Sequence, residues 1–184
     1  MLKEVYKQIS NYYFSISTTT RQIREGEQDG IDYHFVSKEQ FEKDIEAGNF
    51  LEWAKVHDNY YGTSLKPIMN AVNEGKLVIF DIDVQGHDIV RSKLDHLTTS
   101  VFITTPTLSE LKNRLNNRAT DSKEVIEKRI ENSKVEINYL DKYDYFLIND
   151  DLQTASNQLV CIAQATMLKS TLNDKDNLVK NWLQ

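Results

Sequence analysis

The sequence predicts an α/β fold built around a parallel sheet, and three apolar runs carry that prediction. Residues 77–80 (Leu-Val-Ile-Phe), 101–103 (Val-Phe-Ile) and 145–148 (Tyr-Phe-Leu-Ile) are short, continuous and bounded by glycine or polar residues. Such runs are typical of strands buried on both faces of a parallel sheet. Segments with helical spacing alternate with them, and this alternation gives α/β architectures.

The first third of the chain alternates between helix and strand signals. Residues 2–9 place apolar side chains at helical spacing, so the chain opens in a helix. Phe14 and Ile16 alternate with serines and predict a strand. Tyr33 and Phe35 predict a return strand after a glycine-containing stretch that allows turns.

Two short helices and another strand are expected next. Ser37 and Gln40 form a capping-box pattern, which predicts a helix that begins there and ends near Gly48. Apolar residues from 50 to 56 predict a strand, and a helix begins within 67–72.

The second half contains two further helices before the last strand. Residues 107–110 (Thr-Leu-Ser-Glu) repeat the capping-box pattern at the start of one of them. The next is predicted to begin at Asp121 and to turn three isoleucines inward: Ile126, Ile130 and Ile137. One or two helices are expected between residues 153 and 184.

Composition limits what the protein can do. A chain of 184 residues with 40% hydrophobic content fits one globular unit, and a net charge of −6 disfavours nonspecific nucleic-acid binding. The sequence shows neither a secretory signal nor an apolar run long enough to cross a membrane, so a cytoplasmic protein is expected.

Cys161 is predicted to be a buried small hydrophobe rather than a nucleophile. The four histidines lack metal-ligand spacing.

The arginines are clustered. Of six, only Arg91 lies outside two short regions, which hold Arg21 and Arg24 in one and Arg114, Arg118 and Arg129 in the other. Guanidinium groups match phosphate oxygens, so this clustering on an acidic chain predicts two phosphate sites. For the second cluster, arginines on a helix surface remain an alternative.

The first cluster lies among residues suited to a nucleotide. Hydroxyl-rich Ser-Thr-Thr-Thr precedes Arg21, and Tyr33 can donate to another phosphate oxygen. Further on, Glu52 can accept from a base edge, and residues 59–64 (Asn-Tyr-Tyr-Gly-Thr-Ser) add a phenol and two hydroxyls. Tyr33 and Tyr61 could instead be core aromatics, and Glu52 a solvent-facing strand residue.

These motifs resemble the GMP-binding segment of guanylate kinases. The shared patterns are S-T-T-T-R-x-x-R-x-G-E, D-Y-x-F, F-L-E-W and N-Y-Y-G-T-S, followed in order by residues 81–86, 114–129 and 148–151. The resemblance implies a P-loop nucleoside monophosphate kinase-like parallel sheet with helices on both faces. It also implies ATP-dependent phosphorylation of GMP to GDP, with Mg²⁺ accompanying ATP and no metal site of its own.

The resemblance divides the chain into parts with separate roles. It implies a core of residues 1–16 and 67–106, a mixed α/β GMP-binding lobe of 17–66, a lid of 107–132, and core and C-terminal helices from 133 to 184. The implied GMP-binding residues are Ser17, Arg21, Arg24, Tyr33, Glu52, Tyr61, Thr63 and Asp81. Catalysis is implied for Arg114, Arg118 and Arg129, and ATP binding for Arg114, Arg118 and Asn149. The lid pattern departs from the family at Ala119, where glycine is usual.

One expected motif is missing. P-loop kinases carry G-x-x-x-x-G-K-[ST] after a first strand, and these 184 residues do not contain it. One explanation is an N-terminally truncated guanylate kinase that lacks its first core strand and is inactive or weakly active. The alternative is a catalytically dead module that keeps the GMP pocket. The first is favoured, because a module freed from catalysis would not need all three arginines of the second cluster. The sequence does not predict an oligomeric state.

Overall fold

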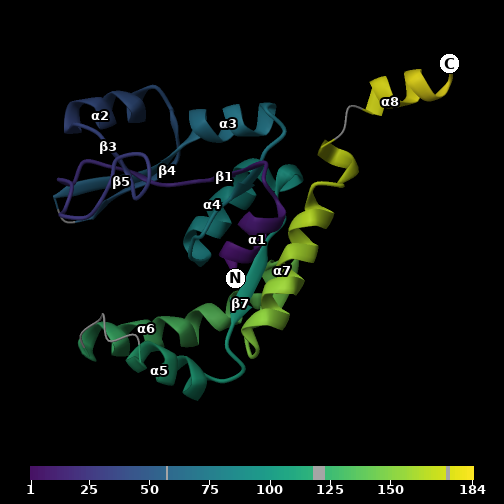
Figure 1. The fold of residues 1–184 in the computed structure, drawn as a ribbon. Coiled ribbons are helices and arrows are strands. Elements are labelled where there is room, and N and C mark those ends of the chain that lie inside the picture. The colour runs from purple at the N-terminus through teal and green to yellow at the C-terminus, as the bar shows by residue number, and fades with distance from the viewer. Residues whose placement is uncertain (57, 118–122, 173–174) are drawn as a thin grey trace. The chain divides into compact units, whose positions relative to one another are not determined.

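The computed structural model describes residues 1–56, 58–117, 123–172 and 175–184, and it has the predicted α/β architecture (Figure 1). Helices and strands alternate along most of the chain. In order, the elements are α1 (Leu2–Gln8), β1 (Tyr12–Phe14), β2 (Thr18–Thr19), β3 (His34–Phe35), α2 (Lys38–Glu46), β4 (Phe50–Val56), β5 (Asn59–Ser64), α3 (Leu65–Asn73), β6 (Leu77–Ile79), α4 (Val84–Leu94), η1 (Asp95–Leu97), β7 (Val101–Thr104), α5 (Leu108–Asn117), α6 (Lys123–Glu136), η2 (Ile137–Lys142), β8 (Tyr145–Ile148), α7 (Leu152–Thr166), η3 (Ser170–Leu172) and α8 (Lys175–Trp182).

Both predicted helix starts are confirmed by side-chain caps. The Ser37 hydroxyl accepts a hydrogen bond from the backbone N–H of Gln40 at 3.1 Å, and Thr107 accepts one from Glu110 at the same distance. Each bond satisfies a donor that has no partner inside its helix. Gly48, just beyond α2, has a φ of 68°, a conformation that glycine adopts without strain.

The chain forms two compact units. One comprises Ser10–Asp95, and the other comprises Met1–Ile9 together with His96–Gln184.

The Ser10–Asp95 unit contains two sheets. β1 and β6 pair in parallel, with Tyr12 opposite Leu77. The other sheet is mixed, with the order β3-β2-β5-β4. In it β2 runs parallel to β3, while β5 runs antiparallel to both β2 and β4. α2 anchors this second sheet, because its fully buried Phe41 stacks on Phe50 at 4.3 Å and on Tyr60 at 5.2 Å between ring centroids.

The hairpin of β4 and β5 depends on Gly62. A Cβ atom at this position would lie 2.8 Å from the Glu52 carbonyl oxygen and 2.9 Å from the Trp53 Cβ. Both neighbours belong to β4 and cannot move without disturbing the strand pairing. The glycine is therefore required by the close approach of the two strands rather than by an unusual φ angle.

Gly62→Ala is expected to destabilise the protein by about 1–3 kcal/mol, the usual cost of forcing an extra methyl group into a closely packed site. Urea unfolding of this variant and of the wild type measures the difference. Equal stability of the Gly62 variant and the wild type would contradict the close approach.

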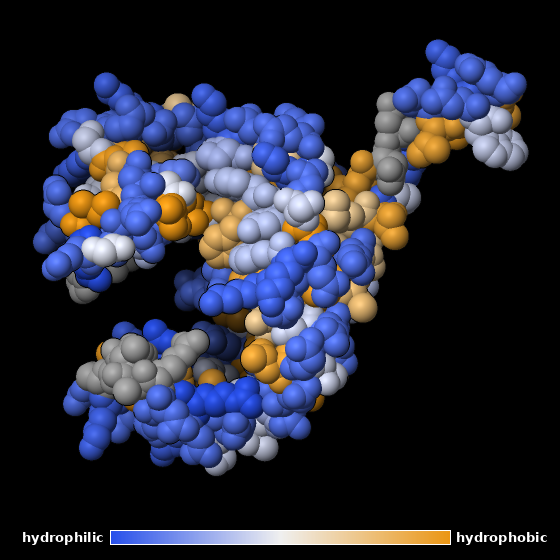
Figure 2. Space-filling view, viewed as in Figure 1, coloured by the Kyte–Doolittle hydropathy of each residue, from blue (hydrophilic) through white to orange (hydrophobic). Residues whose placement is uncertain are grey.

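The other unit contains the parallel pair β7 and β8, with Val101 opposite Tyr145. α1 packs on α7, and α5 and α6 lie side by side as a hairpin (Figure 1). Leu111 and three buried residues, Leu115, Ile126 and Ile130, hold the hairpin together. Leu178, Val179 and Trp182 of α8 are exposed, as is Leu183 just after it, and hydrophobic surface is visible on this C-terminal segment in Figure 2.

The structure corrects the expected burial of the three apolar runs. β6 is half-buried, and Ile103, Tyr145, Phe146 and Ile148 are all more than two-fifths exposed. Within the described part of the chain, β6 pairs only with β1, and β7 only with β8. Two-stranded sheets cannot enclose their strands on both sides as a larger parallel sheet does.

Two further burial predictions are wrong. Ile137 is 43% exposed, because α6 ends at Glu136 and the tighter η2 turn changes the helical period. Cys161 is exposed, because the buried stripe of α7 ends at Val160 and the next residue turns away. Asp121, the predicted start of the lid's second helix, lies outside the described residues. Among the described helices, none is long and apolar enough to cross a bilayer.

Candidate nucleotide-binding site

The Ser10–Asp95 unit brings three predicted phosphate-binding residues together. The Arg21 guanidinium lies over the Tyr33 ring, 5.4 Å from its centroid, and the Tyr33 and Tyr61 rings are 6.1 Å apart. Arg21 follows β2, Tyr33 precedes β3 and Tyr61 lies in β5. They meet because β2 pairs with β5, which places Thr19 opposite Tyr61. A cation and two phenols in one place form a suitable seat for a phosphate.

Glu27, which is not among the predicted site residues, holds Arg21 in place. The Nη2 group of Arg21 donates to both oxygens of Glu27, at 2.7 and 3.0 Å, and Nη1 donates to the Gln22 carbonyl at 2.7 Å. Glu27 also accepts the backbone N–H of Arg24 at 2.9 Å. The available signal was its place in the R-x-x-R-x-G-E pattern.

These contacts change the acidity of both groups. The hydrogen bond from Arg21 holds the pKa of Glu27 below its usual range, with a further contribution from the Arg24 N–H. The hydrogen bond to Glu27 is also the largest factor that raises the pKa of Arg21, and the Tyr61 hydroxyl adds to it. Arg21 therefore stays a cation throughout the physiological range.

The depressed pKa of Glu27 predicts a pH-dependent stability. A carboxylate with a lowered folded-state pKa stabilises the fold above its unfolded pKa of about 4.3, and loses that contribution as the pH falls through the folded value. The gap in melting temperature between wild type and Glu27→Gln should therefore be constant at neutral pH and close under acid conditions. A gap that widened below pH 4 would contradict the assignment.

Three further residues that the sequence predicts to bind GMP are Ser17, Arg24 and Asp81. Ser17 is half-buried just before β2, and its carbonyl accepts the His34 N–H at 2.9 Å. The side chain of Arg24 is exposed. Asp81 is exposed after β6, whereas nearby Asp83 caps α4 by accepting from two backbone N–H groups. Of these two carboxylates, only Asp83 is used as a helix cap.

A second polar pair joins β4 and β5. The hydroxyl of Thr63, which is 6% exposed, donates to Oε1 of half-buried Glu52 at 2.6 Å. The register shifts between Phe50 and Glu52, and such irregularities re-aim side chains. Since residues two apart in a strand share a face, Tyr61 and Thr63 lie on the same side of β5. β5 therefore connects the cluster of Arg21, Tyr33 and Tyr61 to the hydrogen bond between Thr63 and Glu52.

The predicted ATP-binding and catalytic residues that the structure describes, Arg114, Arg129 and Asn149, belong to the other unit. Arg114 of α5 donates to Glu110 at 2.6 Å, to the Asn149 carbonyl at 2.7 Å and to the Asp150 carbonyl at 3.4 Å. It thereby joins α5 to the segment that follows β8. The side-chain Oδ1 of Asn149 is buried and has no hydrogen-bond partner among the described residues. A buried acceptor without a partner is costly, so this oxygen has capacity for one more hydrogen bond.

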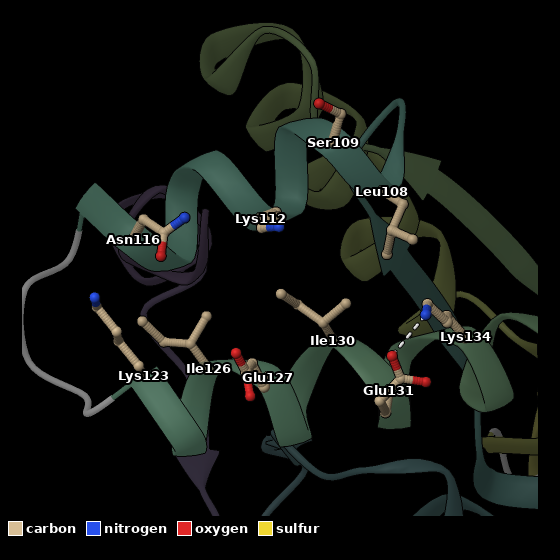
Figure 3. Close-up of a pocket in the computed structure, with 10 residues that line it drawn as sticks. All are labelled: Leu108, Ser109, Lys112, Asn116, Lys123, Ile126, Glu127, Ile130, Glu131 and Lys134. Atoms are coloured by element: carbon tan, nitrogen blue, oxygen red, sulfur yellow. Dashed lines mark hydrogen bonds and ion pairs between the residues drawn. The ribbon is translucent and has the colours of Figure 1, made fainter.

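Two of the three arginines of the second cluster lie among the described residues, Arg114 on α5 and the exposed Arg129 on α6, whereas Arg118 lies outside them. A cavity of about 630 Å³ between α5 and α6 (Figure 3) is lined by Leu108, Ser109, Lys112, Asn116, Lys123, Ile126, Glu127, Ile130, Glu131 and Lys134. Arg114 is two positions from Lys112, about 200° around the helix. The cavity therefore lies on the face opposite to Arg114.

Comparison with known proteins identifies the family. A sequence model described as guanylate kinase matches residues 1–166. The guanylate kinase of Sulfurimonas denitrificans is 55% identical, covering 99% of this chain and 88% of its own length, and that of Wolinella succinogenes is 49% identical, covering 99% and 85%. The crystal structure of guanylate kinase from Anaplasma phagocytophilum superposes with a TM-score of 0.73 at 28% identity, over 97% of this chain and 89% of that one. With the Arg21 cluster and the Glu52–Thr63 pair in place, these matches establish that the chain belongs to the guanylate kinase family.

Proposed function

We propose that the protein catalyses, or forms most of the machinery for, the ATP-dependent phosphorylation of GMP to GDP. The observation that carries this proposal is the placement of Tyr61 and Thr63 on one face of β5. Tyr61 belongs to the cluster with Arg21, and Thr63 is bonded to Glu52 at 2.6 Å. One face of β5 thus contributes Tyr61 to the phosphate seat and Thr63 to a hydrogen bond with Glu52 of β4, whose carboxylate can pair with the N1–H and amine of guanine.

The other GMP-side residues complete this proposed site. Arg21, Arg24, Tyr33 and Tyr61 bind the GMP phosphate, while Ser17, Glu52 and Thr63 bind the guanine edge. The exposed carboxylate of Asp81 orders the substrate or the hydration shell of Mg²⁺. In the proposed division, residues 17–66 form the GMP-binding lobe and 107–132 the lid, between core segments 1–16, 67–106 and 133–184.

ATP is assigned to the other set of residues. The unpartnered Oδ1 of Asn149 can accept a hydrogen bond from the exocyclic amine of adenine. Arg114, Arg118 and Arg129 supply positive charge for the phosphates and the transferring group. Mg²⁺ in phosphoryl transfer is usually held by phosphates and one or two carboxylates. We propose that it enters with ATP, bound to the phosphates.

A second candidate is GMP binding without efficient catalysis. It applies to these 184 residues taken alone, which do not contain the G-x-x-x-x-G-K-[ST] segment whose backbone and lysine neutralise phosphate charge in P-loop kinases. None of the proposed GMP contacts depends on that segment. GMP binding and GMP phosphorylation are therefore separable properties of these 184 residues.

Two measurements test the proposal. Calorimetry with GMP and AMP measures the base preference, and a coupled assay of ADP formation with GMP and ATP measures catalysis. GMP binding with ADP formation supports the kinase, and GMP binding alone supports the second candidate. Failure to bind GMP, or equal binding of AMP, would contradict both.

Arg114→Ala is expected to weaken ATP binding by about tenfold, because it removes a cation and releases the segment that carries Asn149. GMP binding should be unchanged. Lys112→Ala, on the opposite face of α5, is the matched control and should affect neither ligand. A parallel loss of GMP affinity in the Arg114 variant would refute the assignment of separate residue sets.

A further inference from the structure

Glu27 is an unexpected group at a phosphate seat. Its carboxylate is negative, as is the phosphate, yet both of its oxygens contact Arg21, and the two side chains are only 20% and 12% exposed. Such an arrangement has two possible consequences. The carboxylate either competes with phosphate for the guanidinium or holds the guanidinium ready for it.

The pattern of donors favours the second consequence. Glu27 and the Gln22 carbonyl engage Nη2 and Nη1, while the Nε–H group has no carboxylate or carbonyl acceptor among the described residues. Tyr33 and Phe35 support the guanidinium plane, with its carbon 5.4 and 5.7 Å from the two ring centroids. The group is thus fixed in orientation by its neighbours, with donor capacity remaining for an oxyanion.

Glu27 also fixes the loop around Arg21. The same oxygen that accepts from Arg21 at 3.0 Å accepts the Arg24 backbone N–H at 2.9 Å. Residues 21–27 are therefore closed into a ring before any ligand binds. Both predicted phosphate-binding arginines lie on this ring.

We propose that Glu27 is a positioning residue of the GMP site, which holds Arg21 and the 21–27 loop in the phosphate-binding arrangement without contacting GMP. The inference rests on the proposed GMP site. An arginine that is already ordered loses less conformational freedom when phosphate binds, so the carboxylate increases affinity for the nucleotide.

A double-mutant cycle tests this inference on the 184-residue chain, with GMP affinity measured by NMR titration. Glu27→Gln should weaken GMP binding by about tenfold or more, since it removes the charge and one of the two acceptor oxygens. In the Arg21→Ala background the same substitution should have a clearly smaller effect, about threefold or less, because the guanidinium is gone and only the bond to the Arg24 backbone N–H remains to be weakened. The exposed neighbour variant Glu25→Gln is the control and should bind like the wild type.

The GMP affinities of these variants distinguish positioning of Arg21 by Glu27 from competition between Glu27 and phosphate. Tighter or unchanged GMP binding by Glu27→Gln would overturn the inference, and tighter binding would favour competition. A full loss in the Arg21→Ala background would also overturn it, because the effect would then be general rather than transmitted by the guanidinium. If the wild type does not bind GMP, the proposed function itself fails.

Discussion

Glu52→Gln is expected to weaken GMP binding by on the order of 10²- to 10⁴-fold while ATP binding is unchanged, because a site built around a polar partner strongly rejects a mismatch. In the proposed site the carboxylate accepts from the N1–H and the exocyclic amine of guanine. Thr63 donates to one of its oxygens at 2.6 Å, which orients the group. Glutamine would replace one acceptor by an amide donor, which faces a guanine donor or loses the Thr63 bond.

Calorimetric titration of GMP and ATP measures this effect. Glu46→Gln is the matched control, because it makes the same chemical change on the exposed end of α2. Comparable losses in both variants would point to a charge effect rather than base recognition. Retained GMP affinity in the Glu52 variant would remove this residue from the site.

The second large effect concerns catalysis. The 184 residues expressed alone are expected to phosphorylate GMP more slowly, by on the order of 10³-fold or more, than the same residues preceded by a strand and a G-x-x-x-x-G-K-[ST] loop. Such a loop supplies a cradle of backbone N–H groups, a lysine and a hydroxyl ligand for Mg²⁺. A single charge-stabilising arginine accounts for about 10³–10⁵ in related phosphoryl transfers, so the loss of three contributions should be at least as severe.

The coupled ADP assay and GMP titration should be performed on both proteins. GMP affinity should be similar, because none of the proposed GMP contacts lies in the added segment. A third protein, in which the loop lysine is replaced by alanine, separates catalysis from any gain in stability. Rapid turnover by the 184 residues alone would mean that another part of the chain binds the transferring phosphates.

Local chemistry explains which parts of the fold could be predicted from the sequence. The caps at Ser37 and Thr107 and the turn at Gly48 are decided by neighbouring residues, so their patterns predicted the helix boundaries well. Burial depends on what else covers an element. The apolar residues of β8 were therefore predicted to be buried, whereas Phe146 is 61% exposed.

In the site, too, local motifs predicted individual residues, but contacts between residues far apart in the sequence could not be predicted. Motifs indicated Arg21, Tyr33 and Tyr61 individually, but their contact depends on the pairing of β2 with β5 across some forty residues. Glu27 was missed because a carboxylate in a phosphate site contradicts simple charge matching. Its role becomes visible only when its bonds to Arg21 are known. The orphan oxygen of Asn149 likewise depends on its surroundings.

The geometry of β5 also sets a length. Tyr61 and Thr63 are two positions apart, which corresponds to about 7 Å along the strand. Gly62 lies between them and cannot accept a side chain, because β4 is too close. The two contact points are therefore held at a constant spacing by the strand itself. In the proposed site β5 therefore fixes the distance between the contact for the phosphate and the contact for the base before the nucleotide binds.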